Sequence, residues 1–213
     1  MNLTSCQKDI FWLIVLLLFS AIFGVLFFPG IKKAQAANCG GVTVCACGDT
    51  VTSNYTLTAD LSCTGTGLTI GADSITIDGA GFTISGNDTG TGIYNNGYDY
   101  ATTTNLTITN FPSGINYATG ADNGAITNNN ISSCSSNGIN LSFSNTNTIS
   151  GNTVYNNDQN ISNQNGINLL SSNTNTISGN TIKSNSTIIY FYISNSNNYE
   201  WFVKLFPLWY NKT

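Results

Sequence analysis

The sequence predicts an all-β solenoid, a parallel β-helix of about six coils, and three observations support this prediction. Residues 138–153 read GINLSFSNTNTISGNT, and residues 166–181 repeat this segment with few changes. Within each repeat, apolar and polar residues alternate over three to five positions, which is typical of a strand with one buried face. Past residue 40, no helix-length stretch shows an apolar stripe between helix caps. Units of this length cannot bury an apolar face alone, so we expect them to stack.

The repeats extend beyond the two clearest copies. A glycine followed by an apolar residue recurs at positions 67, 92, 114, 138 and 166, which gives periods of 25, 22, 24 and 28 residues. The segments between the apolar sets are rich in Asn, Gly, Ser and Thr, which favour turns. We therefore assign residues 67–199 to the β-helix repeats, with a degenerate last unit at 190–199.

Stacking would place equivalent residues of successive coils over one another at a spacing of about 4.8 Å. Isoleucines at one position would form an aliphatic column in the interior. Asparagines at another position would exchange amide hydrogen bonds along the axis of the stack. The residues predicted for these two columns are Ile126, Ile149 and Ile177, and Asn129, Asn152 and Asn180.

Residues 1–36 have the features of an export signal. An uncharged apolar stretch at 10–28 follows Lys8, and the small-x-small sequence Ala34-Gln35-Ala36 comes after it. This pattern favours a signal peptide cleaved after Ala36, and the alternative is a retained N-terminal membrane anchor. Either reading places the chain from about residue 37 onward outside the cytoplasm, secreted or at the cell surface. Contact with a membrane is expected only through an uncleaved N-terminal helix.

Five cysteines follow residue 36, and four of them lie within 25 residues. In an oxidising compartment this cluster predicts one or two disulfides near the start of the domain. A zinc site is the competing interpretation, but the chain has no His and the spacing Cys45-x-Cys47 is too short. We expect Cys134 to be the unpaired thiol. The disulfide candidates, whose pairing the sequence leaves open, are Cys39, Cys45, Cys47 and Cys63.

The charge distribution excludes some functions. All six basic residues are lysines, and none lies between residues 34 and 182, so nucleic-acid binding has no electrostatic basis. After residue 36 the chain has three lysines and nine acids, a net charge of −6. We predict no cofactor and no metal site.

Three motifs give the chain a family resemblance: CGDTVTSNYTLTADLSC at 47–63, GLTIGADSITIDGAGFTISG at 67–86, and the two GIN…NTNTISGNT units. They resemble secreted right-handed parallel β-helix repeat proteins of the pectate-lyase-like superfamily, including periplasmic NosD-like proteins. The resemblance covers roughly residues 39–182. It implies a right-handed β-helix and an N-terminal cap over residues 37–66, with the cysteines bonding the cap to the first coil.

The resemblance does not select one activity, because this superfamily contains lyases, glycosidases, adhesins and proteins without an assigned role. Uronate lysis needs a cationic base, which the repeat region lacks. Hydrolysis needs converging carboxylates, and no two acids are adjacent or two apart, although coils could bring distant acids together. Copper handling, which the NosD-like relatives suggest, is disfavoured because the chain has no His and its one Met is Met1.

We therefore predict a non-catalytic extracellular scaffold or glycan-binding surface protein, with an extracellular polysaccharide as the expected partner. The alternative is a polysaccharide-degrading enzyme whose acids meet across coils. Tyrosines on a long turn can stack on sugar rings while a carboxylate accepts hydroxyl hydrogen bonds, whereas ordinary packing of these tyrosines is the competing interpretation. The candidate ligand-binding residues are Tyr94, Tyr98, Asp99, Tyr100 and Tyr117.

The C-terminal tail, residues 200–213, is aromatic and apolar, unlike the polar cap that the end of a solenoid requires. One interpretation is a hydrophobic lid over the last coil. The other is an open end that promotes self-association.

Overall fold

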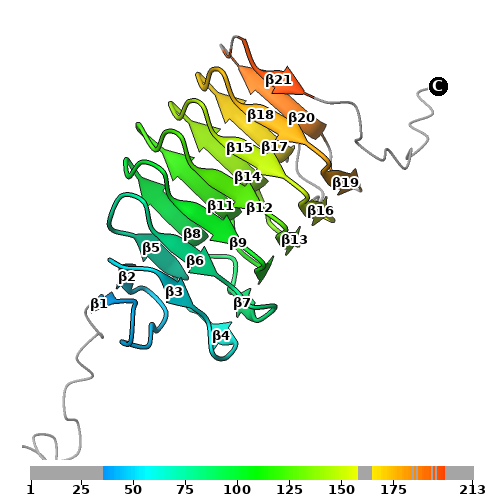
Figure 1. Ribbon diagram of the computed structural model, residues 1–213. Coiled ribbons are helices and arrows are strands. Elements are labelled where there is room, and N and C mark those ends of the chain that lie inside the picture. Colours follow the sequence, from blue (N-terminus) through cyan, green and yellow to red (C-terminus); the bar gives the residue numbers. More distant parts are fainter. Residues whose placement is uncertain are drawn as a thin grey trace, which may run out of the picture. The chain divides into compact units, whose positions relative to one another are not determined.

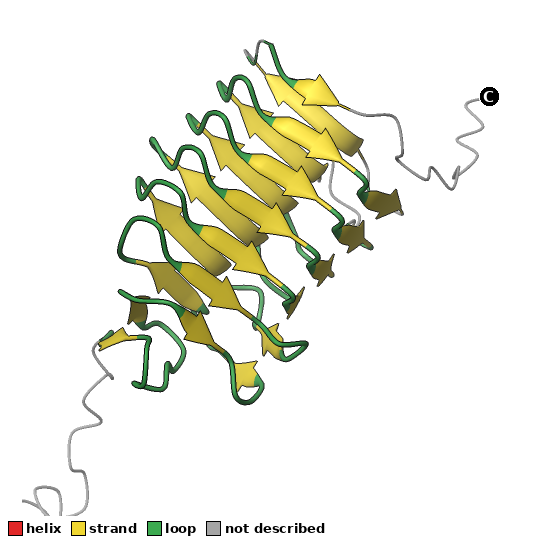
Figure 2. Ribbon diagram, in the orientation of Figure 1, coloured by secondary structure: helices red, strands yellow, loops and turns green. Residues whose placement is uncertain are grey.

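The computed structural model describes residues 36–157, 165–183, 185, 187–192, 194 and 196–199. These residues form strands and loops without a helix (Figure 2). Accordingly, the described part of the chain contains no helix long and apolar enough to span a bilayer. Two predicted segments lie outside the described residues, namely the export signal up to residue 35 and the aromatic tail at 200–213. Two of the nine acids that follow residue 36 also lie outside them, Asp158 and Glu200.

The strands form three parallel sheets. The 8-stranded sheet contains β1 (Asn38–Cys39), β2 (Thr50–Val51), β5 (Leu68–Ile70), β8 (Thr91–Asn96), β11 (Ser113–Ala118), β14 (Asn137–Ser142), β17 (Asn165–Leu170) and β20 (Thr187–Tyr192). The 7-stranded sheet contains β3 (Tyr55–Thr56), β6 (Thr76–Asp78), β9 (Thr102–Thr104), β12 (Ala125–Thr127), β15 (Thr148–Ser150), β18 (Thr176–Ser178) and β21 (Asn198–Tyr199). The 6-stranded sheet contains β4 (Leu61–Ser62), β7 (Thr83–Ser85), β10 (Thr107–Thr109), β13 (Asn130–Ser132), β16 (Thr153–Tyr155) and β19 (Thr181–Lys183).

β1 and β2 pair with each other in the 8-stranded sheet. From β2 onward, consecutive strands enter different sheets, and every third strand pairs in parallel with its equivalent in the next coil (Figure 1). The result is a β-solenoid of about six coils, which confirms the predicted fold. In the three-residue strands of the 7- and 6-stranded sheets the middle residue is buried, and in β6, β7, β9 and β10 the residues on either side of it are partly exposed. In β5 the first and third residues are buried instead. The alternation of apolar and polar residues in the sequence therefore corresponds to side chains that point alternately into and out of the coil.

The interior is filled by columns of aliphatic side chains. In the 7-stranded sheet, Ile126 pairs in register with Ile149, and Ile149 with Ile177. All three are at most 1% exposed. The other two sheets contribute equivalent columns, through Ile93, Ile115 and Ile139 in one and Ile108, Ile131 and Val154 in the other.

A column of buried asparagines joins the coils at the turn between the 7- and 6-stranded sheets. Asn152 accepts through Oδ1 from the backbone N–H of Asn129 at 2.9 Å, and Asn180 accepts in the same way from Asn152. The amide nitrogen of Asn152 donates to the carbonyl oxygen of Ile126 at 2.8 Å and to Oδ1 of Asn180 at 2.9 Å. Each asparagine side chain thus forms hydrogen bonds with backbone N–H and C=O groups of the turn, which have no partner in a sheet.

A second asparagine column occupies the turn between the 8- and 7-stranded sheets. Asn147 accepts from the backbone N–H of Gly124 at 2.7 Å, and Asn175 accepts from that of Asn147 at 2.7 Å. Asn197 continues the column into the last coil. The sequence analysis missed this column, although Asn147 and Asn175 are the second asparagines of the two NTNT motifs.

A third column follows the turn from the 6- to the 8-stranded sheet. Asn157 accepts from the backbone N–H of Cys134 at 2.9 Å, and Asn185 accepts from that of Asn157 at 3.1 Å. The amide nitrogen of Asn157 is buried and has no partner among the described residues. This column, which contains a cysteine in place of one asparagine, is therefore less complete than the other two.

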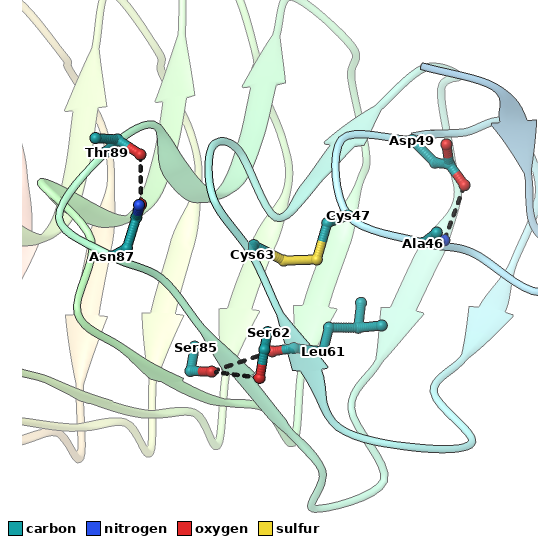
Figure 3. The surroundings of a disulfide bond; sticks show 9 residues. All are labelled: Ala46, Cys47, Asp49, Leu61, Ser62, Cys63, Ser85, Asn87 and Thr89. Carbon is teal, nitrogen blue, oxygen red and sulfur yellow. Dashed lines mark hydrogen bonds between the residues drawn. A yellow bond between two sulfur atoms is a disulfide. The ribbon is translucent and has the colours of Figure 1, made fainter. Parts of the chain in front are cut away.

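Two disulfides hold the segment that precedes the repeats. Cys39 is bonded to Cys45 and Cys47 to Cys63, which confirms the prediction of disulfides among these four cysteines. The second bond joins the chain before β2 to the residue directly after β4 (Figure 3). Asp49 accepts from the backbone N–H of Ala46 at 2.8 Å in the same region (Figure 3). That this segment acts as an N-terminal cap stays a prediction.

We expect Asn152→Ala to lower the free energy of unfolding by about 3 kcal/mol or more, because it leaves buried groups of Asn129 and Ile126 without partners. Denaturant unfolding followed by circular dichroism measures this loss. The matched control is Asn96→Ala, at an exposed position that pairs with Ala118 in the next coil. It should change stability by less than about 0.5 kcal/mol. Equal losses in the two variants would contradict a special role for the buried column.

The two disulfides should contribute unequally. Cys47–Cys63 closes a segment with a sequence separation of 16, and Cys39–Cys45 one of 6. The loop-entropy model gives about 3 kcal/mol for the first and about 2 kcal/mol for the second. Replacing each pair by serines and comparing urea midpoints tests this order. A larger loss from the Cys39/Cys45 pair would show that loop closure is not the main contribution.

Candidate functional site

The predicted ligand-binding residues do not form one group in the structure. Tyr94 lies in β8 and faces outward from the 8-stranded sheet, where it pairs in register with Thr69 and Asn116. Tyr98, Asp99 and Tyr100 lie in the turn that leads from this sheet to the 7-stranded sheet. Tyr117 lies in β11 with its side chain inside the coil.

The assignment of Tyr117 to the ligand-binding surface was wrong. Its side chain is fully buried, and its hydroxyl group donates to the carbonyl oxygen of Ala101 at 3.2 Å and is hydrogen-bonded to Thr103 Oγ1 at 3.0 Å. Burial raises the pKa of Tyr117 well above its usual value, and the hydrogen bond from Thr103 opposes this shift only in part. Thr103 takes the place of an isoleucine of the interior column, since it pairs with Ile126, and it gives the phenol a polar partner.

The turn with Tyr98 and Tyr100 presents two exposed aromatic rings, which are 36% and 59% exposed. The fully buried Asn95 fixes the turn, because its amide donates to the carbonyl oxygen of Tyr98 at 2.8 Å and accepts from the backbone N–H of Tyr98 at 3.0 Å. Tyr100 has a left-handed backbone (φ 57°) and donates its N–H to the carbonyl oxygen of Asp122 in the next coil at 2.9 Å. The backbone that carries both rings is thus hydrogen-bonded to Asn95 in its own coil and to Asp122 in the next coil.

Three aspartates form a column beside these tyrosines. Oδ1 of Asp73 accepts from the backbone N–H of Asp99 at 2.8 Å, and Oδ1 of Asp99 accepts from that of Asp122 at 2.9 Å. Asp122 in turn accepts from the backbone N–H of Asn145 at 2.6 Å. The second oxygen of each carboxylate has no hydrogen-bond donor among the described residues. Successive carboxylates are therefore about one coil apart, at roughly 4.8 Å.

The sequence analysis singled out Asp99 but missed this column. It searched for acids close together along the chain, whereas these three are brought together by the coil register. A signal was present, because each aspartate stands three residues before the start of β6, β9 or β12. We call Asp73, Tyr98, Asp99, Tyr100 and Asp122 the corner surface.

A third exposed aromatic ring extends this edge of the solenoid. Phe143 is 57% exposed, and its carbonyl oxygen accepts from the backbone N–H of Gly120, one coil before it, at 2.8 Å. It follows β14 directly, as Gly97 follows β8. Aromatic side chains thus occur on this turn in two coils, with one coil between them.

The described residues contain no group of three or more His, Cys, Asp or Glu side chains that could hold a metal ion. The free thiol of Cys134 is fully buried. Burial raises its pKa to about 12, and the charge of Asp88 adds to this shift, whereas the backbone N–H of Phe111 opposes it. A thiol in this state is a poor nucleophile and a poor metal ligand.

We expect Cys134 to resist alkylation in the folded protein at pH 8, because the thiolate is disfavoured and the sulfur atom is inaccessible. Mass spectrometry after iodoacetamide treatment should find this cysteine unmodified under native conditions and modified in 6 M guanidinium, with both disulfides left oxidised. Rapid labelling of the native protein would contradict the buried position.

One protein-family model matches the chain, over residues 36–200, and its description is "Periplasmic copper-binding protein (NosD)". No curated protein and no solved structure matches. Because the match covers most of the chain, the chain belongs to the NosD family, as its resemblance to periplasmic β-helix proteins implied. The periplasmic character of this family and the two disulfides indicate an extracytoplasmic location.

Proposed function

We propose that this member of the NosD family is a non-catalytic, extracytoplasmic scaffold whose corner surface binds a neutral polysaccharide. The observation that carries the proposal is the pair of exposed rings, Tyr98 and Tyr100, on a turn fixed by the buried Asn95. Aromatic rings of this kind stack on the C–H faces of sugars, and a fixed turn reduces the entropy lost on binding.

The aspartate column supplies the polar part of such a site. Asp73, Asp99 and Asp122 each have one oxygen committed to a backbone N–H of the next coil, which orients the carboxylate. The remaining oxygens can accept hydrogen bonds from sugar hydroxyl groups, and they recur along the axis at about 4.8 Å. A polymer with a hydroxyl-rich repeat that runs along the axis would meet equivalent acceptors in successive coils.

Charge disfavours an acidic polymer and is compatible with a neutral one. After residue 36 the chain has a net charge of −6, and no lysine or arginine lies between residues 34 and 182. A polyuronate or a sulfated glycan would be repelled by the aspartate column. The same absence of a cationic base disfavours uronate lysis.

Copper does not fit the residues that the structure describes, although the family description names it. Copper(I) prefers thiolate and thioether ligands, and copper(II) prefers imidazole. The chain has no His and its one Met is Met1. Cys39, Cys45, Cys47 and Cys63 are in disulfides, and Cys134 is buried with a raised pKa. We therefore assign no role to copper in the proposed function.

Polysaccharide hydrolysis is the second candidate, and the aspartate column is the observation that favours it. Retaining glycosidases use two carboxyl groups about 5 to 5.5 Å apart, close to the spacing of successive coils. However, these two groups must approach the scissile bond from different sides. Asp73, Asp99 and Asp122 lie in one column, and each is held by a backbone N–H in the same way. This arrangement supports binding over turnover.

The double variant Tyr98→Ala/Tyr100→Ala should bind a neutral polysaccharide about tenfold or more weakly, because it loses two stacking platforms. A glycan array identifies the polymer, and isothermal titration calorimetry measures the affinity. The matched control is Tyr192→Ala, an exposed tyrosine on β20 that lies outside the corner surface. It should bind as the unmodified protein does.

Reducing-sugar release, measured on the same polymer, separates the candidates. Binding without release supports the proposal, whereas release would make the protein a hydrolase. The absence of any binding to neutral glycans would leave a purely structural role.

A further inference from the structure

A groove lies at the other border of the 7-stranded sheet, where the chain turns toward the 6-stranded sheet. The turn between β6 and β7 has four residues, 79–82, whereas the equivalent turns of the next two coils have two, 105–106 and 128–129. The groove beside this longer turn has a volume of about 450 Å³. Its lining includes Asp78, Gly81, Asn105, Thr107, Asn128 and Asn130.

The longer turn is fixed against the next coil. Gly79 donates its N–H to the carbonyl oxygen of Thr104 at 2.8 Å, and Gly81 donates to that of Asn105 at 2.9 Å. A Cβ atom at position 79 would lie 2.5 Å from the carbonyl oxygen of Asn105, so only glycine permits this approach. The groove is therefore formed before any ligand binds.

Asp78 places one carboxylate in this groove. Its Oδ1 accepts from the backbone N–H of Ala80 at 2.9 Å and from the side-chain amide of Asn105 at 3.1 Å. Its second oxygen has no donor among the described residues, and the sequence offers no lysine or arginine between residues 34 and 182. The carboxylate is thus oriented, with an acceptor oxygen that lacks a partner in the protein.

Two amides lie beside this carboxylate in successive coils. Because the amide nitrogen of Asn105 donates to Asp78, its Oδ1 remains available as an acceptor. A Cβ atom at position 151 would lie 2.5 Å from Oδ1 of Asn128, so the glycine in the next coil leaves room for the Asn128 side chain. The groove thus has one anionic acceptor and two amides at intervals of about one coil, roughly 4.8 Å.

We propose that this groove binds one amino-sugar unit, with the ammonium group against the unpartnered oxygen of Asp78 and the ring hydroxyls against Asn105 and Asn128. The volume lies within the range of small-ligand sites. One carboxylate balances one ammonium group, whereas a bare divalent cation needs more oxygen ligands of this kind. The proposal does not depend on polysaccharide binding at the corner surface, because the two sites share no residue.

Asp78→Asn is an almost isosteric test, because an amide oxygen still accepts from Ala80 and Asn105 while the charge is lost. We expect a glucosamine trimer to bind the unmodified full chain and to bind this variant about tenfold or more weakly. Isothermal titration calorimetry at low salt measures both affinities. The matched control is Asp88→Asn, at an exposed aspartate in the turn between β7 and β8 that belongs to neither site. It should leave the affinity for the glucosamine trimer unchanged.

A second variant keeps the proposal testable if Asp78→Asn affects folding. Asn128→Gly removes the amide without backbone strain, because Asn128 has a left-handed backbone (φ 55°) and Gly151 has the same conformation in the next coil. It should weaken binding about fivefold. In the unmodified protein, the affinity should also fall as the salt concentration rises.

Three results would overturn the proposal. The first is equal affinity for the glucosamine trimer and its N-acetylated counterpart, which has no ammonium groups. The second is equal affinity of the unmodified protein and both groove variants. The third is binding of a lysine tripeptide as tight as that of the glucosamine trimer, which would make the groove a general ammonium site.

Discussion

From the coil that contains Leu106 onward, asparagine side chains join successive coils of this solenoid at the turns, where the backbone has no sheet partner. One amide supplies an acceptor and two donors, which is what a turn between stacked coils requires. In the column between the 7- and 6-stranded sheets, Asn152 forms hydrogen bonds with groups of both neighbouring coils. Because these bonds fix the register of the turns, they also fix what the turns carry outside, including the aspartate column and the groove beside Asp78.

The sequence was sufficient to predict the features that repeat along the chain. The GIN…NTNTISGNT units predicted the stacking of Ile149 on Ile177, and the cysteine cluster predicted the disulfides. Features that depend on coil register were missed. Asp73, Asp99 and Asp122 are 26 and 23 residues apart and come together only when the turn lengths are known. Tyr117 was misplaced because the alternation within its own strand, which points it inward like Ile115, was not applied to it.

Family membership and local chemistry lead to different conclusions about ligands. The NosD family description names a periplasmic copper-binding protein, but the part of the chain that the structure describes has no accessible thiol, thioether or imidazole, the groups that copper prefers. The polar groups of the corner surface and of the groove are instead hydroxyls, amides and carboxylates, which suit sugar recognition. The corner surface and the groove lie at the two borders of the 7-stranded sheet. A β-helix can change its ligand in this way, because the turns vary while the interior columns remain.

Hydrogen exchange of backbone amides tests the role of the asparagine columns most directly. The N–H groups of Asn129, Asn147 and Asn152 lie in turns, yet each donates to a buried asparagine oxygen of the next coil. If these bonds hold the stack together, the three amides should exchange as slowly as the central amides of β12 and β15, through global unfolding only. Exchange at the rate of exposed turn amides would contradict the account.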